Sequence, residues 1–204
     1  MEETNIQEVK DINRFFFPGE WQEFIKQIDK PKFKNKLLYE LQFHTGARFD
    51  EVKHIRPIDF DFERNNLRIW KTKTKAKKGE KTGKPRTISL STDFSNKMKR
   101  FCADKKPDEY LFKISQVGYN QLIKRQLLKL NVINAKDFSS HNIRKTHGMY
   151  LKALGIDIAE ICTRLGHDYN TYIKHYGSAD VFSEKDMRGI RDLLGDLYIR
   201  QRRF

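Results

Sequence analysis

Four short stretches of the sequence carry side chains whose types suit chemistry on a phosphate. They span residues 45–51, 71–86, 141–147 and 165–177, and they supply arginines, lysines, histidines and tyrosines. Arginine presents a planar fork of donors that can grip two phosphate oxygens, and fixed cations stabilise the charge that develops in a phosphoryl transition state. A tyrosine hydroxyl beside a phosphate can act as the nucleophile. Each stretch alone is weak evidence, but together they predict phosphoryl transfer through a covalent intermediate.

Several other kinds of phosphate chemistry are disfavoured. The sequence has no G-x-x-x-x-G-K-[ST] phosphate-binding loop. It also has no acidic cluster with metal-ligand spacing, which argues against a two-metal nuclease. Its two cysteines, Cys102 and Cys162, exclude a disulfide scaffold and a four-thiolate zinc site. We therefore expect a reaction that uses no metal ion and no other cofactor.

The charge of the chain indicates a polyanionic partner. Lysine and arginine number 41 against 27 aspartates and glutamates, which gives a formal net charge of +14. Nucleic acid is the polyanion that a basic protein most often meets inside a cell, and its binding releases counterions. A lysine-rich surface produced by a compositionally biased genome is the alternative explanation.

Half of this net charge lies in residues 71–86, which hold seven lysines and one arginine against one glutamate. The segment contains two glycines and no apolar residue except Ala76, so it cannot pack into a core. We expect an exposed hairpin loop that contacts DNA phosphates. The expected DNA-binding residues are Lys71, Lys75, Lys77, Lys78, Lys81, Lys84 and Arg86.

Helical patterns must position these groups, because apolar residues at helical spacing fill most of the chain. The expected helices cover residues 20–28, 31–45, 49–54, 92–103, 115–130, 140–154, 157–165, 169–176 and 183–199. Gly46, Gly155 and Gly166 suit the ends of three of them, since glycine readily takes the left-handed conformation that stops a helix.

Three short strands are expected beside the helices. Residues 58–62 alternate apolar and acidic side chains, and residues 67–70 and 86–90 continue the strand pattern. Asn65 and Asn66 suit a turn between the first two strands, and the basic segment joins the last two. We therefore expect an α+β fold, mainly helical, with a small three-stranded antiparallel sheet.

The order and spacing of the four stretches resemble the catalytic domain of the tyrosine recombinases, the phage-integrase family. The family's first arginine box, roughly T-G-x-R-x-x-E, appears as T-G-A-R-F-D-E at residues 45–51. Its H-x-x-R box appears as H-N-I-R at residues 141–144, and its L-G-H box lies at residues 165–167. The family's nucleophilic tyrosine lies nine residues after that last histidine, the position of Tyr176. The resemblance implies the tyrosine-recombinase catalytic-domain fold.

The resemblance also implies the roles of the matched residues. Arg48, Arg144 and His167 are expected to hold the nonbridging oxygens of the scissile phosphate. Tyr176 is expected to attack the phosphorus and form a 3′-phosphotyrosine link. His141 is expected to assist as acid or base, which suits a side chain that titrates near neutral pH.

Supporting roles follow from the same resemblance. Glu51 is expected to support the site from behind the first arginine. A hairpin lysine is expected to protonate the leaving 5′ oxygen; Lys73 is the first choice, with Lys75 and Lys81 as alternatives. The sequence departs from the family at Lys145, where the family usually has histidine, and we expect this change to be tolerated.

Other aromatic residues and histidines near the boxes have simpler expected roles. Tyr169 and Tyr172 lie close to the nucleophile position and are core aromatics or, second to Tyr176, alternative nucleophiles. His147 and His175 are expected to be packing or supporting groups. His44 and His54 are expected to be structural, as are Tyr110, Tyr119 and Tyr150.

The domain boundaries are expected at three places. Residues 1–30 form a lead-in segment, residues 31–182 the catalytic domain, and residues 183–204 an amphipathic helix with a basic tail. That helix packs either on its own domain or on a neighbouring protomer. Family members commonly carry an N-terminal DNA-clamping domain, for which the first 30 residues are too few, so we interpret the sequence as a catalytic domain or a reduced enzyme.

The implied partners are double-stranded DNA at specific attachment sites and further copies of the chain, four protomers on two paired sites. No apolar run approaches the roughly 18 residues of a membrane span, and the N-terminus is not a signal peptide, so we expect a cytoplasmic protein with no membrane partner. The composition suits an enzyme of a mobile element. The rival hypotheses are a type IB topoisomerase, which shares the chemistry, and a DNA-binding protein without catalysis.

Overall fold

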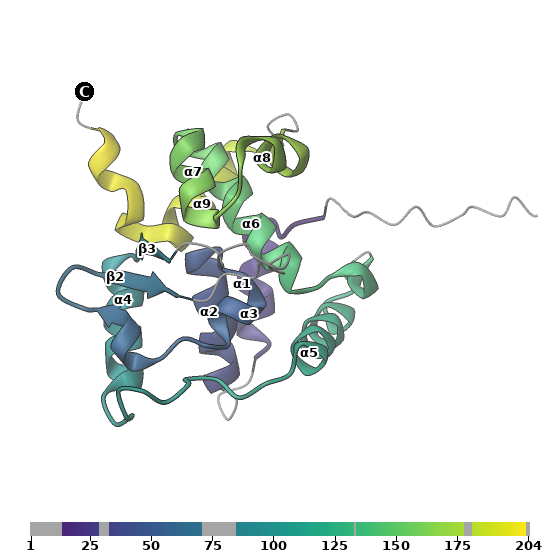
Figure 1. Cartoon of the computed structure of the whole chain (residues 1–204). Helices are drawn as coiled ribbons and strands as arrows, with labels where there is room; N and C mark the ends of the chain where they lie inside the picture. The colour runs from purple at the N-terminus through teal and green to yellow at the C-terminus, as the bar shows by residue number, and fades with distance from the viewer. Residues whose placement is uncertain (1–13, 29–32, 71–84, 133, 178–180, 203–204) are drawn as a thin grey trace, which may run out of the picture.

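Helices make up most of the structure, a computed structural model that describes residues 14–28, 33–70, 85–132, 134–177 and 181–202 (Figure 1). The helices are α1 (Pro18–Lys26), α2 (Phe33–Thr45), α3 (Phe49–Val52), α4 (Thr92–Cys102), α5 (Gln116–Lys129), α6 (Ser140–Ala153), α7 (Ile158–Leu165), α8 (Tyr169–Tyr176) and α9 (Glu184–Leu194). Short 3-10 turns cover Pro57–Asp59, Ala135–Asp137 and Gly195–Arg202. Within the described ranges, no helix is both long and apolar enough to cross a membrane.

The sheet has three antiparallel strands in the order β1-β2-β3, at one edge of the helical body (Figure 1). They are β1 (Phe60–Asp61), β2 (Asn66–Ile69) and β3 (Arg86–Ser89), so the expected fold class is confirmed. The first strand is shorter than the expected 58–62, because Pro57–Asp59 wind into a 3-10 turn. The Asp59 carboxylate stabilises that turn by accepting the backbone N–H of Arg56 at 2.8 Å.

Several helix ends are fixed by single residues. The Ser139 hydroxyl caps α6, and the Asp157 and Asp168 carboxylates accept backbone N–H groups at the starts of α7 and α8. Gly46 and Gly166 end α2 and α7 with φ angles of +61° and +64°, which side-chain-bearing residues rarely adopt. These two glycines turn the chain just before the arginine of the first box and the histidine of the L-G-H box.

The core is centred on α2 and α6, which pack against each other and bury nearly all of α6. N-terminal aromatic residues close one end of it. Trp21 stacks on Phe43 with ring centroids 4.4 Å apart, and the Tyr150 hydroxyl donates to the carbonyl of the buried Phe16 at 3.0 Å. Residues 14–28 therefore share one core with α6, stabilised mainly by the apolar surface that they bury together.

The C-terminal helix is shorter than the expected 183–199. It ends at Leu194 because Gly195 turns the chain with φ of +60° and ψ of −136°, and a kinked 3-10 segment follows. Within the single chain, α9 packs on α1, and Asp196 accepts the backbone N–H of Thr92 on α4 at 2.7 Å. The contacts of this segment in the described chain are thus with its own domain.

Candidate active site

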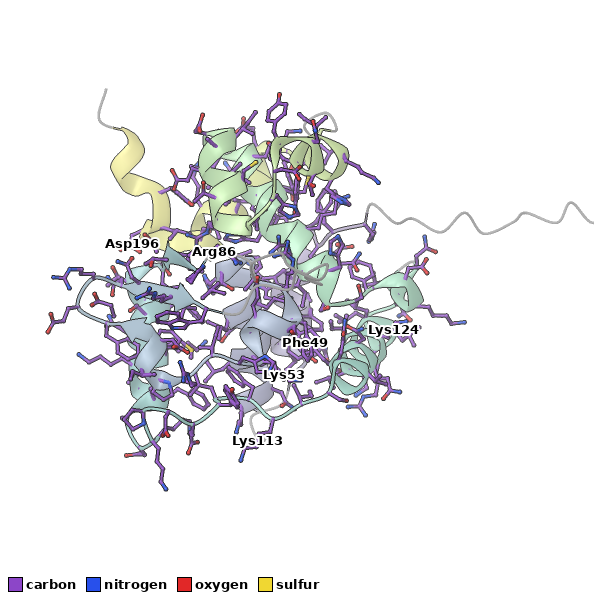
Figure 2. The ribbon with its side chains drawn as sticks, in the orientation of Figure 1. Phe49, Lys53, Arg86, Lys113, Lys124 and Asp196 are labelled. Carbon is purple, nitrogen blue, oxygen red and sulfur yellow. The ribbon has the colours of Figure 1, made fainter. Side chains whose placement is uncertain are left out.

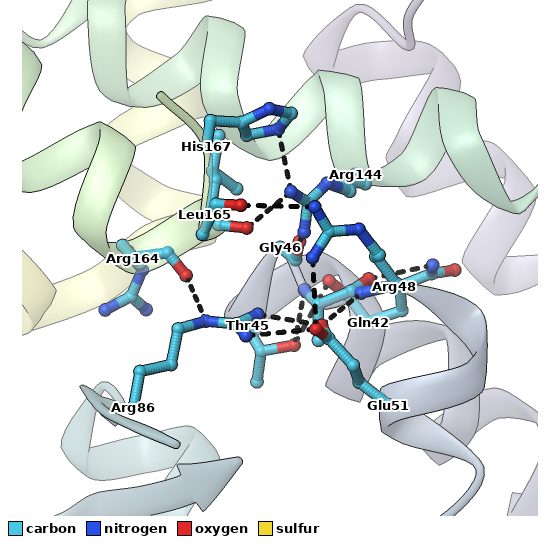
Figure 3. A network of polar contacts seen from close by, with 12 residues as sticks. Gln42, Thr45, Gly46, Arg48, Glu51, Arg86, Arg144, Arg164, Leu165 and His167 are labelled. Atoms are coloured by element: carbon cyan, nitrogen blue, oxygen red, sulfur yellow. Dashed lines mark hydrogen bonds and ion pairs between the residues drawn. The ribbon is translucent and has the colours of Figure 1, made fainter. Parts of the chain in front are cut away.

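Arg144 projects from α6 into the centre of the site, where two helix ends hold its guanidinium (Figure 3). Nη1 donates to the Gly46 carbonyl at 2.8 Å, and Nη2 donates to the Leu165 carbonyl. The last carbonyls of a helix have no partner within the helix and carry the negative end of its dipole. The C-terminal ends of α2 and α7 therefore orient a buried cation without a carboxylate that would cancel its charge.

Arg48 lies next to this group, directly before α3. Its Nη2 donates to the Gly166 carbonyl at 3.1 Å, and its Nη1 donates to Glu51 Oε1 at 3.2 Å. Glu51 also accepts the backbone N–H of Arg48 at 2.8 Å, which fixes the start of α3. Burial alone would raise the pKa of Glu51. The hydrogen bond and charge of Arg86, the backbone N–H of Arg48 and the charge of Arg144 lower it overall, so the carboxylate is ionised at neutral pH.

A cavity of about 180 Å³ opens beside the two arginines. Its lining residues are Gln42, Arg48, Phe49, Asp50, Gln116, Ser140, His141 and Arg144. Burial, and after it the Arg48 charge, lowers the pKa of Arg144 to about 9, so this guanidinium is still charged at neutral pH. Two guanidinium groups at one cavity are a donor set that suits the oxygens of a phosphate.

His167 follows Gly166 and accepts a hydrogen bond from Arg144, whose Nη2 lies 2.7 Å from His167 Nε2. Burial, followed by the charges of Arg144 and Arg48, lowers the pKa of His167 to about 3. The ring is therefore neutral at pH 7. Because a guanidinium group only donates, Nε2 is the acceptor and the ring proton sits on Nδ1. His167 therefore helps to orient the Arg144 guanidinium through Nε2.

Tyr176 is the last residue of α8, and its side chain is buried against the site. Its ring meets the His167 ring edge-on, with centroids 6.0 Å apart and an interplanar angle of 82°. Burial raises the pKa of Tyr176 to about 12, although the Arg144 charge opposes this rise. The tyrosine is thus neutral at rest, and cations near it favour its ionised form.

Two further histidines complete the cluster of rings. His141, on the first turn of α6, lies 5.7 Å from His175 between ring centroids, and His175 lies 6.3 Å from both His167 and Tyr176. Burial, and then nearby cations, lowers the pKa values of His141 and His175, so both can accept a proton at pH 7. His175 is off the family pattern, and the sequence analysis expected a packing or supporting role for it.

Arg86 lies on the strand expected for it, but its side chain does not face outward as expected. It begins β3, its side chain is only 7% exposed, and its Nη1 and Nη2 donate to the two Glu51 oxygens at 3.0 and 2.7 Å. The placement corrects the grouping of Arg86 with exposed phosphate contacts, because the ion pair faces the protein interior. Figure 2 shows Lys113, by contrast, extending outward from the molecule.

The remaining hairpin residues lie outside the described part of the chain. These are Lys71, Lys73, Lys75, Lys77, Lys78, Lys81 and Lys84, which include the expected catalytic lysine and its alternatives. Their roles therefore stay predictions. In the parts that are described, no group of three or more histidines, cysteines, aspartates or glutamates is placed to hold a metal ion.

The other tyrosines and histidines near the boxes differ in how deeply they are buried. Tyr169 is 59% exposed, whereas Tyr172 is buried and stacks on Tyr176 with centroids 5.4 Å apart. His147 is buried and accepts a hydrogen bond from Arg164 Nε at 2.9 Å, as a packing group would. Tyr172 therefore packs against Tyr176 as a core aromatic residue would, whereas Tyr169 does not.

Sequence comparisons identify similar proteins. A family model described as the phage integrase family matches residues 14–181. Tyrosine recombinase XerA of Pyrococcus furiosus is 26% identical over 168 residues, 78% of this chain and 54% of that protein. Tyrosine recombinase XerA of Saccharolobus solfataricus is 25% identical over 134 residues, 66% of this chain and 42% of that protein. The chain thus spans about half the length of these relatives.

Comparison with solved structures identifies proteins with a similar fold. The Tn1549 transposon integrase, solved in complex with a circular intermediate DNA, superposes with a TM-score of 0.66 at 17% sequence identity. The match covers 88% of this chain and 65% of that one. At this identity the likeness establishes the fold.

Proposed function

Because this chain belongs to the phage integrase family, we propose that it is a site-specific DNA recombinase that works through a 3′-phosphotyrosine intermediate. One observation carries the proposal: Arg48, Arg144 and His167 meet at one place, beside the buried ring of Tyr176. These residues come from distant parts of the sequence. Bringing a nucleophile and fixed cations together around one reacting group is how enzymes lower the barrier to phosphoryl transfer.

In the proposed first step, the scissile phosphate enters the cavity that Arg48, His141 and Arg144 line. The two guanidinium groups hold the nonbridging oxygens. Backbone carbonyls already fix their directions, so little reorganisation is needed as negative charge builds up on the phosphate. His167 accepts a hydrogen bond from Arg144 and so helps to hold this guanidinium in place.

In the second step, the Tyr176 hydroxyl attacks the phosphorus. A bond from phosphorus to the tyrosine oxygen forms, the bond from phosphorus to the 5′ oxygen breaks, and the 3′ end stays attached to the protein. The tyrosine proton passes to His141, which is neutral at pH 7 because burial and neighbouring cations lower its pKa. The 5′ oxygen takes a proton from a hairpin lysine, for which Lys73 is the first choice.

The phosphotyrosine link conserves the energy of the broken bond. A 5′ hydroxyl from another strand can therefore attack it and reverse the step, with no metal ion or nucleotide consumed. We propose double-stranded attachment sites as the substrate, four protomers on two paired sites as the working assembly, and a mobile element as the source of the gene. The net charge of +14 and the DNA bound in the similar Tn1549 integrase structure support a DNA partner.

The test is capture of the covalent intermediate. The protein is incubated with end-labelled duplexes whose central segment is randomised, and DNA that stays on the protein in detergent but is freed by protease is recovered and sequenced. We expect recovery to enrich one sequence, and a nicked duplex of that sequence then serves as the substrate for rates.

Tyr176→Phe should abolish the adduct and leave DNA affinity nearly unchanged, because the variant loses only a hydroxyl. Tyr172→Phe is the matched control on the same helix, and it should still form the adduct. An adduct that persists in Tyr176→Phe, or wild-type protein that binds the duplexes without ever forming one, would contradict the proposed function.

A further inference from the structure

Arg86 directs all of its donor groups into the protein, although it stands close in sequence to the basic segment 71–84 (Figures 2 and 3). Its Nη1 and Nη2 donate to the two oxygens of Glu51 at 3.0 and 2.7 Å. Its Nε donates to the backbone carbonyl of Arg164 at 2.9 Å. A guanidinium satisfied on all three nitrogens inside the fold is committed to other protein groups rather than to DNA.

The Glu51 carboxylate is shared between two arginines. Oε1 accepts from Arg48 Nη1 at 3.2 Å and from Arg86 Nη1 at 3.0 Å. Oε2 accepts from the Arg48 backbone N–H at 2.8 Å and from Arg86 Nη2 at 2.7 Å. The bidentate pair with Arg86 has the shorter side-chain distances, so Arg86 is the main partner of the Glu51 charge.

This sharing decides how much positive charge Arg48 can offer to a phosphate. The Glu51 side chain is fully buried, so its negative charge needs a close cation. With Arg86 in place, the Glu51 charge is compensated and Arg48 keeps its hydrogen bond to the Gly166 carbonyl. Without Arg86, the Glu51 carboxylate would draw the Arg48 guanidinium toward itself. Arg48 would then no longer direct its positive charge at the cavity.

Arg86 also touches the turn that leads to His167. The Arg164 carbonyl that it binds belongs to the last turn of α7. A Cβ added to Gly166 would lie 3.5 Å from Arg86 Nη1 and 3.7 Å from Arg48 Nη1, so both guanidinium groups pack directly against this glycine. One side chain thus braces the two elements that carry Arg48 and His167.

We propose that Arg86 is a positioning residue of the active site, which compensates Glu51 so that Arg48 remains directed at the phosphate. This role presupposes the proposed strand-transfer function, because it concerns the binding of the scissile phosphate. It separates Arg86 from the neighbouring lysines, which we expect to contact DNA along its backbone.

The first test compares chemistry with binding in Arg86→Gln and Arg86→Lys. At saturating duplex, well below each variant's unfolding temperature, we expect Arg86→Gln to form the adduct about 10- to 100-fold more slowly, by analogy with the loss of a residue that orients a metal ligand. Arg86→Lys should keep part of the rate, since lysine supplies the positive charge but not the two parallel N–H donors of a guanidinium group. DNA affinity and its salt dependence should change by no more than the loss of the single phosphate contact that Arg48 makes.

A residue that binds a DNA phosphate directly would behave differently. Its removal lowers the slope of log affinity against log salt by about 1 and weakens binding to every sequence. That result for Arg86→Gln, with an unchanged rate at saturation, would overturn the positioning role. Arg64→Gln is the matched control, because it removes an exposed ion pair with Asp61 beside the same sheet, and it should leave the rate unchanged.

The second test removes the charge that Arg86 compensates. If Arg86 acts by compensating Glu51, then Glu51→Gln added to Arg86→Gln should recover part of the lost rate. If the rate reductions of the two single variants simply multiplied in the double variant, the proposal would be overturned.

A third readout needs no catalysis: the crystal structure of Arg86→Gln should show Arg48 turned onto Glu51 and released from Gly166. An unmoved Arg48 would overturn the positioning role even if no adduct forms, whereas a wild-type protein without an adduct would refute only the recombinase function.

Discussion

Backbone carbonyls, rather than acidic side chains, hold the guanidinium of Arg144. Those of Gly46 and Leu165 accept its hydrogen bonds, and His167 accepts a third. A carboxylate in their place would fix the same geometry but cancel the charge that a phosphate needs. Glu51, the carboxylate that does contact Arg48, has Arg86 as a second cation. At the scale of residues, the site therefore orients its positive charge without neutralising it.

Gly148 sets the position of the Tyr176 ring. A Cβ at this residue of α6 would lie 2.5 Å from Tyr176 Cε1 and 2.7 Å from its Cζ, closer than such atoms approach. Gly148→Ala should therefore displace the tyrosine and slow adduct formation by at least about tenfold, since small misplacements of reacting groups are costly. Single-turnover adduct assays at saturating duplex measure this effect.

The matched control is Gly19→Ala on α1, where an added Cβ would meet no atom within 4 Å. It should leave the adduct rate unchanged. If Gly148→Ala formed the adduct at the wild-type rate, the Tyr176 ring would not need the place that the structure gives it.

His44 predicts the pH dependence of stability. Burial, followed by the charges of Lys97 and Arg164, lowers its pKa to about 3, whereas the pKa of a histidine in an unfolded chain is about 6.5. Between these values the unfolded chain binds a proton that the folded chain does not, so acidification favours unfolding. The free energy of unfolding should fall below about pH 6.5, by up to about 1.4 kcal/mol per pH unit for this one residue.

Urea titrations at neutral pH and near pH 5 measure this slope. His44→Phe, which can keep the stacking on Phe94, should give a shallower slope than the wild type. The buried His147 and the half-buried His167 contribute in the same direction in both proteins, so only the difference in slope reports on His44. Equal slopes would show that His44 is not held neutral by burial.

At the scale of elements, α1 contributes to the core that holds α2 and α6. Trp21 is 2% exposed and stacks on Phe43. Trp21→Ala should lower the free energy of unfolding by about 3–5 kcal/mol, the usual cost of removing a large buried aromatic side chain. Gln22→Ala on the exposed side of the same helix should change it by less than about 0.5 kcal/mol. A small effect of Trp21→Ala would mean that α1 is not part of the folded core.

Local signals predicted the elements well where one residue decides the outcome. Ser139 and Asp157 cap helices whose expected ranges begin at or next to them, and Gly46 and Gly166 end two helices as expected. These ends deliver the site residues, but the prediction of which residues would meet came from the resemblance to the tyrosine recombinases.

The departures have physical causes that single residues do not reveal. Residues 58–62 alternate like a strand, but a 3-10 turn held by Asp59 occupies the first of them. The apolar stripe continues past Leu194, but Gly195 breaks the helix. Arg86 looked like one more basic loop residue, because its partner Glu51 lies 35 positions away in the sequence.

At the scale of the whole molecule, we expect charge to govern the proposed encounter with DNA. Half of the net +14 lies in residues 71–86. Substituting both Lys77 and Lys78 with glutamine should lower the salt slope of DNA binding by about 2, because each lysine is expected to neutralise one phosphate. Affinity should fall on cognate and random duplexes alike. Fluorescence anisotropy across a salt series measures both quantities.

A paired control changes the net charge equally elsewhere. Lys26 on α1 and Lys185 on α9 are exposed, and substituting both with glutamine should leave the slope within experimental error. If both double variants changed the slope alike, binding would depend on net charge and not on the basic segment.

The most direct measurement identifies the amino acid that carries the DNA. The adduct is digested with nuclease and protease, and tandem mass spectrometry locates the residual nucleotide on the peptide. The proposed mechanism predicts a 3′-linked nucleotide on Tyr176. A nucleotide on Tyr169 or Tyr172, or cognate DNA that binds and never becomes linked, would contradict it.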